Sequence, residues 1–171
     1  MNDKTTHYRH FIEWIEERLG PDPRKKDSGG LARLKRGESP KSAPDAWEIL
    51  IRLGIRDEHF LPCLTVGAAM CRYGKPKDGT ASLGKALASC YEPETKEQGS
   101  LRLRRLLACT SMKECCAVLR PLLAFIASKG KADPSFARLL DELVAFDWPE
   151  RQEKIKLKWA TEYWAEEREK P

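Results

Sequence analysis

The apolar residues of this chain recur at the spacing of α-helices along almost its whole length, and this pattern limits the fold more than any other feature. Residues of one helical face are three or four positions apart, as in the series Tyr8, Phe11, Ile12, Ile15 and Leu19. The apolar–polar alternation of a strand is missing, and β-branched residues are scarce. The sequence therefore predicts an all-α fold built as a helical bundle.

Turn and capping residues divide the first half of this pattern into short helices. Gly20-Pro21 ends the first helix, and the prolines, glycines and charges of 21–30 predict a mobile loop. Asp57 is placed to cap the helix that carries Phe60 and Leu64. We expect the other helices of this half over 31–36, 44–53 and 82–90, with a polar loop over 73–80.

The second half begins after a break that Pro93 predicts. A chain of 171 residues suits one domain or two small ones, and we expect two helical subdomains, 1–92 and 93–171. Ser111-Met-Lys-Glu114 matches a capping box, and Pro121 predicts a kink in the helix that follows. We expect the last two helices to begin at Asp133-Pro134 and at Asp147-Trp-Pro-Glu150.

Composition excludes several classes of protein. A hydrophobic fraction of 41% with 33% charged residues is typical of a globular protein and not of a disordered one. No apolar run approaches the roughly 18 residues of a membrane-spanning helix, so we expect no membrane partner. The first residues, MNDKTTHYRHF, lack the apolar core of a secretion signal, and we therefore expect a cytoplasmic protein.

The six cysteines do not form a recognisable site. None belongs to a CxxC pair and the chain has only three histidines, whereas a zinc site needs four closely spaced ligands. Cys115-Cys116 has no histidine in its own helix to activate a thiolate. We expect the cysteines to be reduced and packed as small hydrophobic side chains.

Two other patterns fail as enzyme or metal motifs. His7-x-x-His10-x-x-Glu13 places three metal ligands on one helix face, but histidines there are more often surface or packing residues. Ser28-Gly-Gly lacks the Gly-Lys-Ser/Thr of a phosphate-binding loop. We expect no enzymatic activity, no metal, no cofactor and no small-molecule substrate.

The charged residues are more informative when they are placed on the predicted helices. The formal charge of +5, from 31 basic and 26 acidic residues, permits a nucleic-acid partner without requiring one. At 100° per residue, basic side chains fall on faces away from or beside the apolar stripes. The residues so placed are Arg33, Arg36, Lys85, Arg104, Arg105, Lys154 and Lys158. Two interpretations remain open: an electrostatic track for a nucleic-acid backbone, or merely solvated faces of a helical protein–protein adaptor.

Aromatic residues near the C-terminus allow the same two interpretations. Single-strand binding proteins stack bases on exposed aromatic rings, for which Trp148 and Trp164 are candidates. Trp159 and Tyr163 instead follow the spacing of the apolar stripe, which predicts that they belong to the core.

Several blocks, in order, resemble one known family. These are the basic Leu-Ala-Arg-Leu-Lys-Arg piece ending at residue 36, the block Ala-Ser-Leu-Gly-Lys-Ala-Leu-Ala over 81–88, and the closing segments over 136–143, 148–151 and 158–164. Together they are similar to the CasB family, the small subunit of the type I-E CRISPR interference complex, Cascade. The resemblance extends from about residue 30 onward.

This resemblance implies a non-catalytic protein of two helical subdomains. It implies that two copies lie head to tail along a crRNA-bearing complex, bind the displaced DNA single strand and stabilise the R-loop. The implied partners are therefore the other Cascade subunits with crRNA, a second copy of the chain, and single-stranded DNA. The residues that match the family's basic positions are Arg33, Arg36, Lys85, Arg104, Arg105, Arg120, Arg138, Arg151, Lys154 and Lys158.

Overall fold

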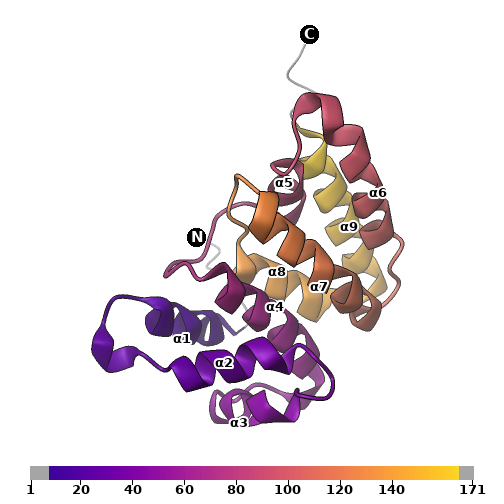
Figure 1. The fold of residues 1–171 in the computed structure, drawn as a ribbon. Coiled ribbons are helices and arrows are strands. Elements are labelled where there is room, and N and C mark those ends of the chain that lie inside the picture. Colours follow the sequence, from indigo (N-terminus) through magenta and orange to yellow (C-terminus); the bar gives the residue numbers. More distant parts are fainter. Residues whose placement is uncertain (1–7, 166–171) are drawn as a thin grey trace, which may run out of the picture.

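The computed structural model describes residues 8–165, and over this range nine α-helices are joined by loops and three short 3-10 helices, without any β-strand (Figure 1). A single bridge between Ala81 and Pro134 is the one strand-like pairing in these residues. The all-α prediction is confirmed. The helices are α1 (Arg9–Leu19), α2 (Ser28–Gly37), α3 (Pro44–Arg52), α4 (Phe60–Tyr73), α5 (Leu83–Ala88), α6 (Lys96–Leu107), α7 (Met112–Lys129), α8 (Phe136–Ala145) and α9 (Pro149–Tyr163).

Helix α4 lies at the centre of the molecule. Every residue over 62–71 is buried, because α2, α7 and α8 all pack against this helix. Small residues allow this close packing: a Cβ on Gly67 would lie 2.8 Å from Cζ of Phe11 in α1. A helix buried on all sides has apolar residues all round, as α4 does.

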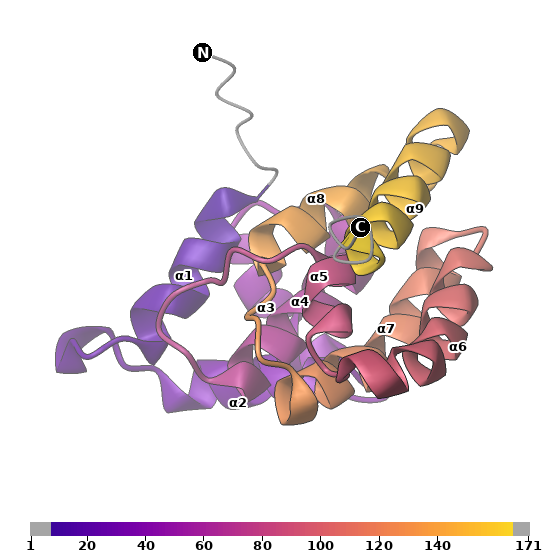
Figure 2. The ribbon, with the colours of Figure 1, turned by 90° about the horizontal axis from the view of Figure 1, so that it is seen from above.

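A second close contact joins α5 to α9. A Cβ on Gly84 would lie 2.2 Å from the carbonyl oxygen of Trp159, so only glycine permits this distance between the two backbones. Trp159 and Tyr163 are fully buried, which confirms that they belong to the core. Tyr163 also donates a hydrogen bond of 2.6 Å to the carbonyl oxygen of Lys96, linking α9 to the start of α6. Seen from above, α1 and α6 lie at opposite sides of the molecule (Figure 2).

The segment 21–30 is more ordered than predicted, and the mobile-loop prediction is wrong for its second half. It contains the 3-10 helix Pro23–Lys25, and α2 already begins at Ser28. Asp27 caps α2, since its Oδ1 accepts a hydrogen bond of 2.9 Å from the backbone N–H of Gly30. This side-chain acceptor offsets the poor helix propensity of the two glycines that follow.

Three aspartates that precede helices in the sequence do not cap those helices. Asp57 begins the 3-10 helix Asp57–His59 instead of capping α4. Asp133 accepts hydrogen bonds from Lys75 (2.7 Å) and Tyr73 (3.0 Å), while Ser135 caps α8. Asp147 accepts a hydrogen bond of 2.7 Å from the backbone N–H of Met112. It therefore satisfies the start of α7, although it lies two residues before the start of α9.

The start of α8 receives a further cap from a distant loop. The carboxylate of Asp78 accepts hydrogen bonds from the backbone N–H groups of Phe136 and Ala137, at 2.7 and 3.0 Å. This contact joins the loop after α4 to a helix more than fifty residues further on. The capping box at Ser111 is present in part, since its Oγ accepts a hydrogen bond from the N–H of Glu114. Pro121 lies within α7, and its kink stays a prediction.

The cysteines occupy the core and are all free thiols. Five of the six are buried and Cys90 is half-buried. No group of three or more potential metal ligands occurs within residues 8–165, a range that excludes His7. Among the same residues, none of the helices is both long and apolar enough to cross a membrane. The boundary at 92/93 falls between α5 and the 3-10 helix Pro93–Thr95, and the two subdomains stay a prediction.

Candidate nucleic-acid interface

The predicted basic residues differ in whether a carboxylate already neutralises them. Arg33 pairs with Glu48 at 3.4 Å, and Arg36 lies 3.9 Å from Asp45, both across the contact of α2 with α3. Arg138 is the most strongly engaged, since its Nη2 donates a hydrogen bond of 2.7 Å to Glu162. The charge of each of these arginines is therefore partly neutralised by a carboxylate of the same chain.

The other seven predicted residues form no ion pair with any carboxylate in the described part of the chain. Six of them are exposed and Arg120 is half-buried. They are Lys85 on α5, Arg104 and Arg105 on α6, Arg120 on α7, and Arg151, Lys154 and Lys158 on α9. These seven predicted residues lie on four helices, and all but Lys85 lie in the second half of the chain.

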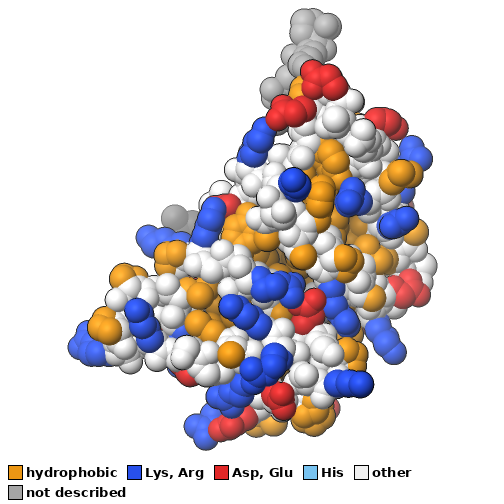
Figure 3. Space-filling view, viewed as in Figure 1, with side chains coloured by type: hydrophobic (Ala, Val, Ile, Leu, Met, Phe, Trp, Pro, Cys, Tyr) orange, Lys and Arg blue, Asp and Glu red, His pale blue; other side chains and the backbone are white. Residues whose placement is uncertain are grey.

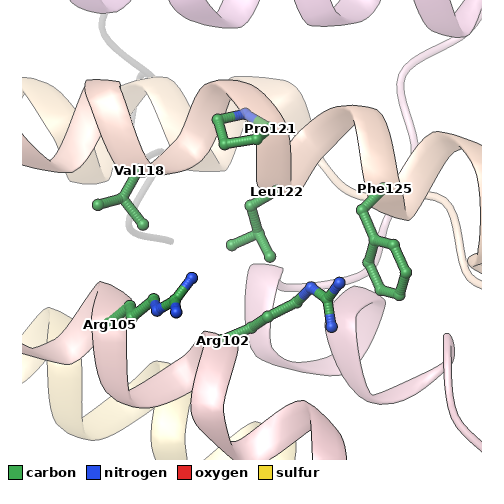
Figure 4. Close-up of a pocket in the computed structure, with 6 residues that line it drawn as sticks. All are labelled: Arg102, Arg105, Val118, Pro121, Leu122 and Phe125. Atoms are coloured by element: carbon green, nitrogen blue, oxygen red, sulfur yellow. The ribbon is translucent and has the colours of Figure 1, made fainter.

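A groove between α6 and α7 gathers two arginines over an apolar surface (Figure 4). Arg102 and Arg105 lie one turn apart on α6, and their guanidinium groups point toward α7. The cavity has a volume of about 340 Å³ and is lined on the α7 side by Val118, Pro121, Leu122 and Phe125. Arg102 is held in place by two contacts. Its Nη1 donates a hydrogen bond of 2.9 Å to the Tyr91 hydroxyl, and its Cζ lies 4.0 Å from the centroid of the Phe125 ring.

Arg120 lies in a different hollow, formed by α2, α3, α4 and α7. This hollow has a volume of about 800 Å³, with Trp47 and Phe60 on one side and Lys113 and Arg120 on the other. The Nε of Arg120 is buried and has no hydrogen-bond partner among residues 8–165. Figure 3 shows lysine and arginine side chains over the face presented by α2, α7 and α6, with apolar side chains between them.

A mixed-charge cluster forms where α5, α8 and α9 meet. Arg138 lies 3.8 Å from Glu142 and 2.7 Å from Glu162, so one guanidinium bridges two carboxylates. Burial raises the pKa of Glu142 to about 7, although the positive charges of Arg138 and Lys158 act to lower it. Burial also acts on Glu162, but hydrogen bonds from Ser82 and Arg138 outweigh it and lower the pKa of that carboxyl. Lys158 therefore faces acidic groups even without a direct ion pair.

The start of α9 presents an exposed aromatic ring beside an arginine. Trp148 is 56% exposed, and the guanidinium carbon of Arg151 lies 4.9 Å from the centroid of its ring. Trp164 is only half-buried but packs edge-on against Tyr163, with ring centroids 4.7 Å apart. Of the two candidate stacking residues, Trp148 offers the more accessible surface.

Sequence reasoning missed Arg102 and Lys113. Arg102 precedes Arg105 by three positions, which puts both on one helical face, and Lys113 precedes Arg120 by seven. The spacing was a usable signal for both. The contact of Arg102 with Phe125 was not predictable, because it depends on how α6 crosses α7.

The fold and these surfaces together define an all-helical protein that carries several basic grooves and faces. The family described as CRISPR-associated protein Cse2 matches residues 30–164, which is most of the chain. The chain therefore belongs to the Cse2 family of CRISPR-associated proteins, which are subunits of the Cascade complex. This confirms the family that the sequence blocks resembled.

Two solved structures, both of proteins from Thermus thermophilus, are similar to the chain. One is a CRISPR-associated protein of the Cse2 family, with 23% identity and a TM-score of 0.65. The other is described as CasB, with 22% identity and a TM-score of 0.64. Each comparison covers 91% of this chain and 96% of the other, so the fold is shared over nearly the full length. The comparison with curated proteins finds no significant match.

Proposed function

We propose that this chain is a non-catalytic small subunit of a type I-E Cascade that binds the displaced non-target DNA strand and stabilises the R-loop. The observation that carries the proposal is the set of basic residues on α5, α6, α7 and α9 that have no carboxylate partner within residues 8–165. A charge that is already paired gains less from a phosphate, whereas a solvated lysine or arginine releases condensed counterions when it binds one.

Such contacts suit the physical problem of an R-loop. The RNA–DNA duplex formed is about as stable as the DNA duplex it replaces, so contacts to the sugar–phosphate backbone shift the balance. Phosphate contacts carry no sequence information directly. A subunit that binds through them therefore accepts any invading DNA sequence.

The proposal gives different roles to the ten predicted residues. Lys85, Arg104, Arg105, Arg120, Arg151, Lys154 and Lys158 are assigned to phosphate contacts. Arg33, Arg36 and Arg138 contribute less, because each must weaken an existing ion pair to bind a phosphate. The proposed partners are the other Cascade subunits with crRNA, a second copy of this chain, and single-stranded DNA in the cytoplasm.

The test removes three unpaired charges and compares the result with the removal of three paired ones. Lys85→Ala/Arg105→Ala/Lys158→Ala should weaken binding to single-stranded DNA equally for all sequences. Log Kd should also depend less steeply on log salt, by about 0.7 per lost phosphate contact. The control Arg9→Ala/Arg24→Ala/Arg52→Ala changes net charge equally but removes arginines that pair with Glu13, Asp22 and Glu48.

The assembled complex provides the second measurement, because multivalency strengthens contacts that are weak in an isolated subunit. R-loop lifetime should shorten with the first triple variant and stay near wild type with the control. Equal effects of the two variants would contradict the site, since binding would then follow net charge alone.

A helical adaptor without nucleic-acid affinity is the second candidate. Two large apolar side chains four positions apart, Trp47 and Ile51, are exposed on α3, and contiguous apolar surface of this kind is typical of protein-binding sites. Filter binding of single-stranded DNA at low and moderate salt separates the two functions. An adaptor shows little affinity at either salt concentration, whereas a phosphate-binding subunit loses affinity steeply between them.

A further inference from the structure

We infer that the groove between α6 and α7 is a pocket for one unpaired nucleobase, with its flanking phosphates held by Arg102 and Arg105. This inference rests on the proposed function and deepens it. It adds a base-dependent contact to a surface otherwise assigned to phosphates.

The groove arises from an apolar stripe on α7 that α6 covers only in part. Val118, Pro121, Leu122 and Phe125 follow at i, i+3, i+4 and i+7, so they line one face of α7. Leu122 is buried, but Val118 and Phe125 are half-buried and Pro121 is exposed. Where α6 would complete the packing it instead presents Arg102 and Arg105. An apolar floor is thus left beneath two positive charges.

The two guanidinium groups are available for a ligand. Arg102 and Arg105 have no carboxylate partner within residues 8–165. Arg102 is already oriented by the Tyr91 hydroxyl and lies over the ring of Phe125, which reduces the entropy lost when a ligand binds. A guanidinium is planar, so its outer face can stack on a second flat ring while its edge donates hydrogen bonds.

The size and chemistry of the groove select the ligand. A volume of about 340 Å³ is at the lower end of the range of about 300–1,000 Å³ for small-molecule pockets, which suits one ring system and not a helix or a strand. The floor is apolar, and among the described residues that line the groove the charged ones are both arginines. An unpaired base in a DNA strand meets both conditions, because it is a flat ring with an anionic phosphate on each side.

The lining also predicts little dependence on which base is bound. Its polar side chains are arginines, which donate hydrogen bonds and accept none. Without an acceptor, the pocket cannot read the donor edges of cytosine or adenine. Stacking on the apolar floor is available to every base.

The test compares a short thymidine strand with a strand of equal length in which the thymidines are replaced by abasic sites. Both carry the same phosphates, so the ratio of their Kd values isolates the base. We expect the wild-type chain to bind the thymidine strand about tenfold more tightly, as one stacked base provides. Equal affinity for the two strands overturns the pocket and leaves the phosphate-binding function intact. Binding to neither strand overturns both.

Three variants place the effect in the groove. Val118→Phe fills the cavity without changing charge and should bring the ratio close to one. Arg105→Ala should also reduce the ratio, because it removes a guanidinium face that lines the pocket for the base as well as a phosphate contact. Arg104→Ala, one residue away and outside the groove, should weaken both strands equally. A ratio unaffected by Val118→Phe and Arg105→Ala overturns the inference.

Photochemical crosslinking of the wild-type chain tests the location without any variant. A strand with one 5-iodouracil base should crosslink to the segment of α7 that contains Phe125, as identified by mass spectrometry of the digested protein. A crosslink confined to another helix places the base elsewhere and overturns the inference.

Discussion

Glu142 offers the sharpest test of the structure, because its environment disfavours its charge. Its side chain is 11% exposed, and neither carboxylate oxygen accepts a well-formed hydrogen bond from the described residues. Burial raises its pKa from 4.5 to about 7. The folded state therefore holds a proton on Glu142 at pH values where the unfolded chain has lost it.

The sign of the pH dependence follows from this difference. Between pH 4.5 and 7 the folded state binds more protons than the unfolded state, so the free energy of unfolding falls as pH rises. A pKa raised from 4.5 to about 7, at about 1.4 kcal/mol for each tenfold change in proton affinity, gives about 3.5 kcal/mol lost by pH 8. Glu142→Gln keeps the shape and removes the charge. It should therefore stabilise the protein by up to about 3.5 kcal/mol at pH 8 and by almost nothing at pH 4.

Urea unfolding followed by tryptophan fluorescence measures this difference at several pH values. The matched control is Glu162→Gln, since Glu162 pairs with Arg138, the arginine that also lies beside Glu142. The pKa of Glu162 is lowered, so its charge contributes stability above the unfolded pKa, and this contribution is lost as pH falls. The control should destabilise the protein at pH 8 and have little effect at low pH. If Glu142→Gln lowered stability at pH 8, or shifted it equally at pH 4 and pH 8, the reasoning would be refuted.

Three further predictions follow from the packing. Gly84→Ala should lower the free energy of unfolding by about 1–3 kcal/mol or more, because the added Cβ would lie 2.2 Å from the carbonyl oxygen of Trp159. An unchanged melting temperature would contradict the close contact of α5 and α9. Asp78→Ala should cost about 1–3 kcal/mol in urea unfolding, since it leaves two N–H groups of α8 without their acceptor, whereas Asp78→Asn should restore part of the loss. With a thiol reagent at neutral pH, at most Cys90 should react in the folded chain, since the other five cysteines are buried. All six should react after unfolding. Two or more fast-reacting thiols in the folded chain would contradict the burial of these five cysteines.

The sequence predicted the helices well because helical periodicity is a local property. The series through Tyr8 and Leu19 and the stripe through Trp159 and Tyr163 needed no knowledge of the rest of the chain. Capping residues were harder, because an aspartate can serve a helix far along the chain. Asp147 precedes α9 but accepts from Met112 at the start of α7, and Asp78 caps α8 from another loop. Nothing in the local pattern distinguishes these acceptors from ordinary N-caps.

The candidate site shows the same division between local and distant information. Periodicity correctly placed Arg105 and Lys158 on solvated faces, because a face depends only on the residue's own helix. Whether a basic residue is free depends on carboxylates elsewhere, and Arg138 pairs with Glu162, 24 positions away on another helix. A track for a nucleic-acid backbone requires unpaired charge, which is a property of packing and not of sequence spacing. Arg138 and Arg105 both match basic positions of the family in the sequence, and the structure separates them into a residue that holds α8 to α9 and one that is available to a ligand.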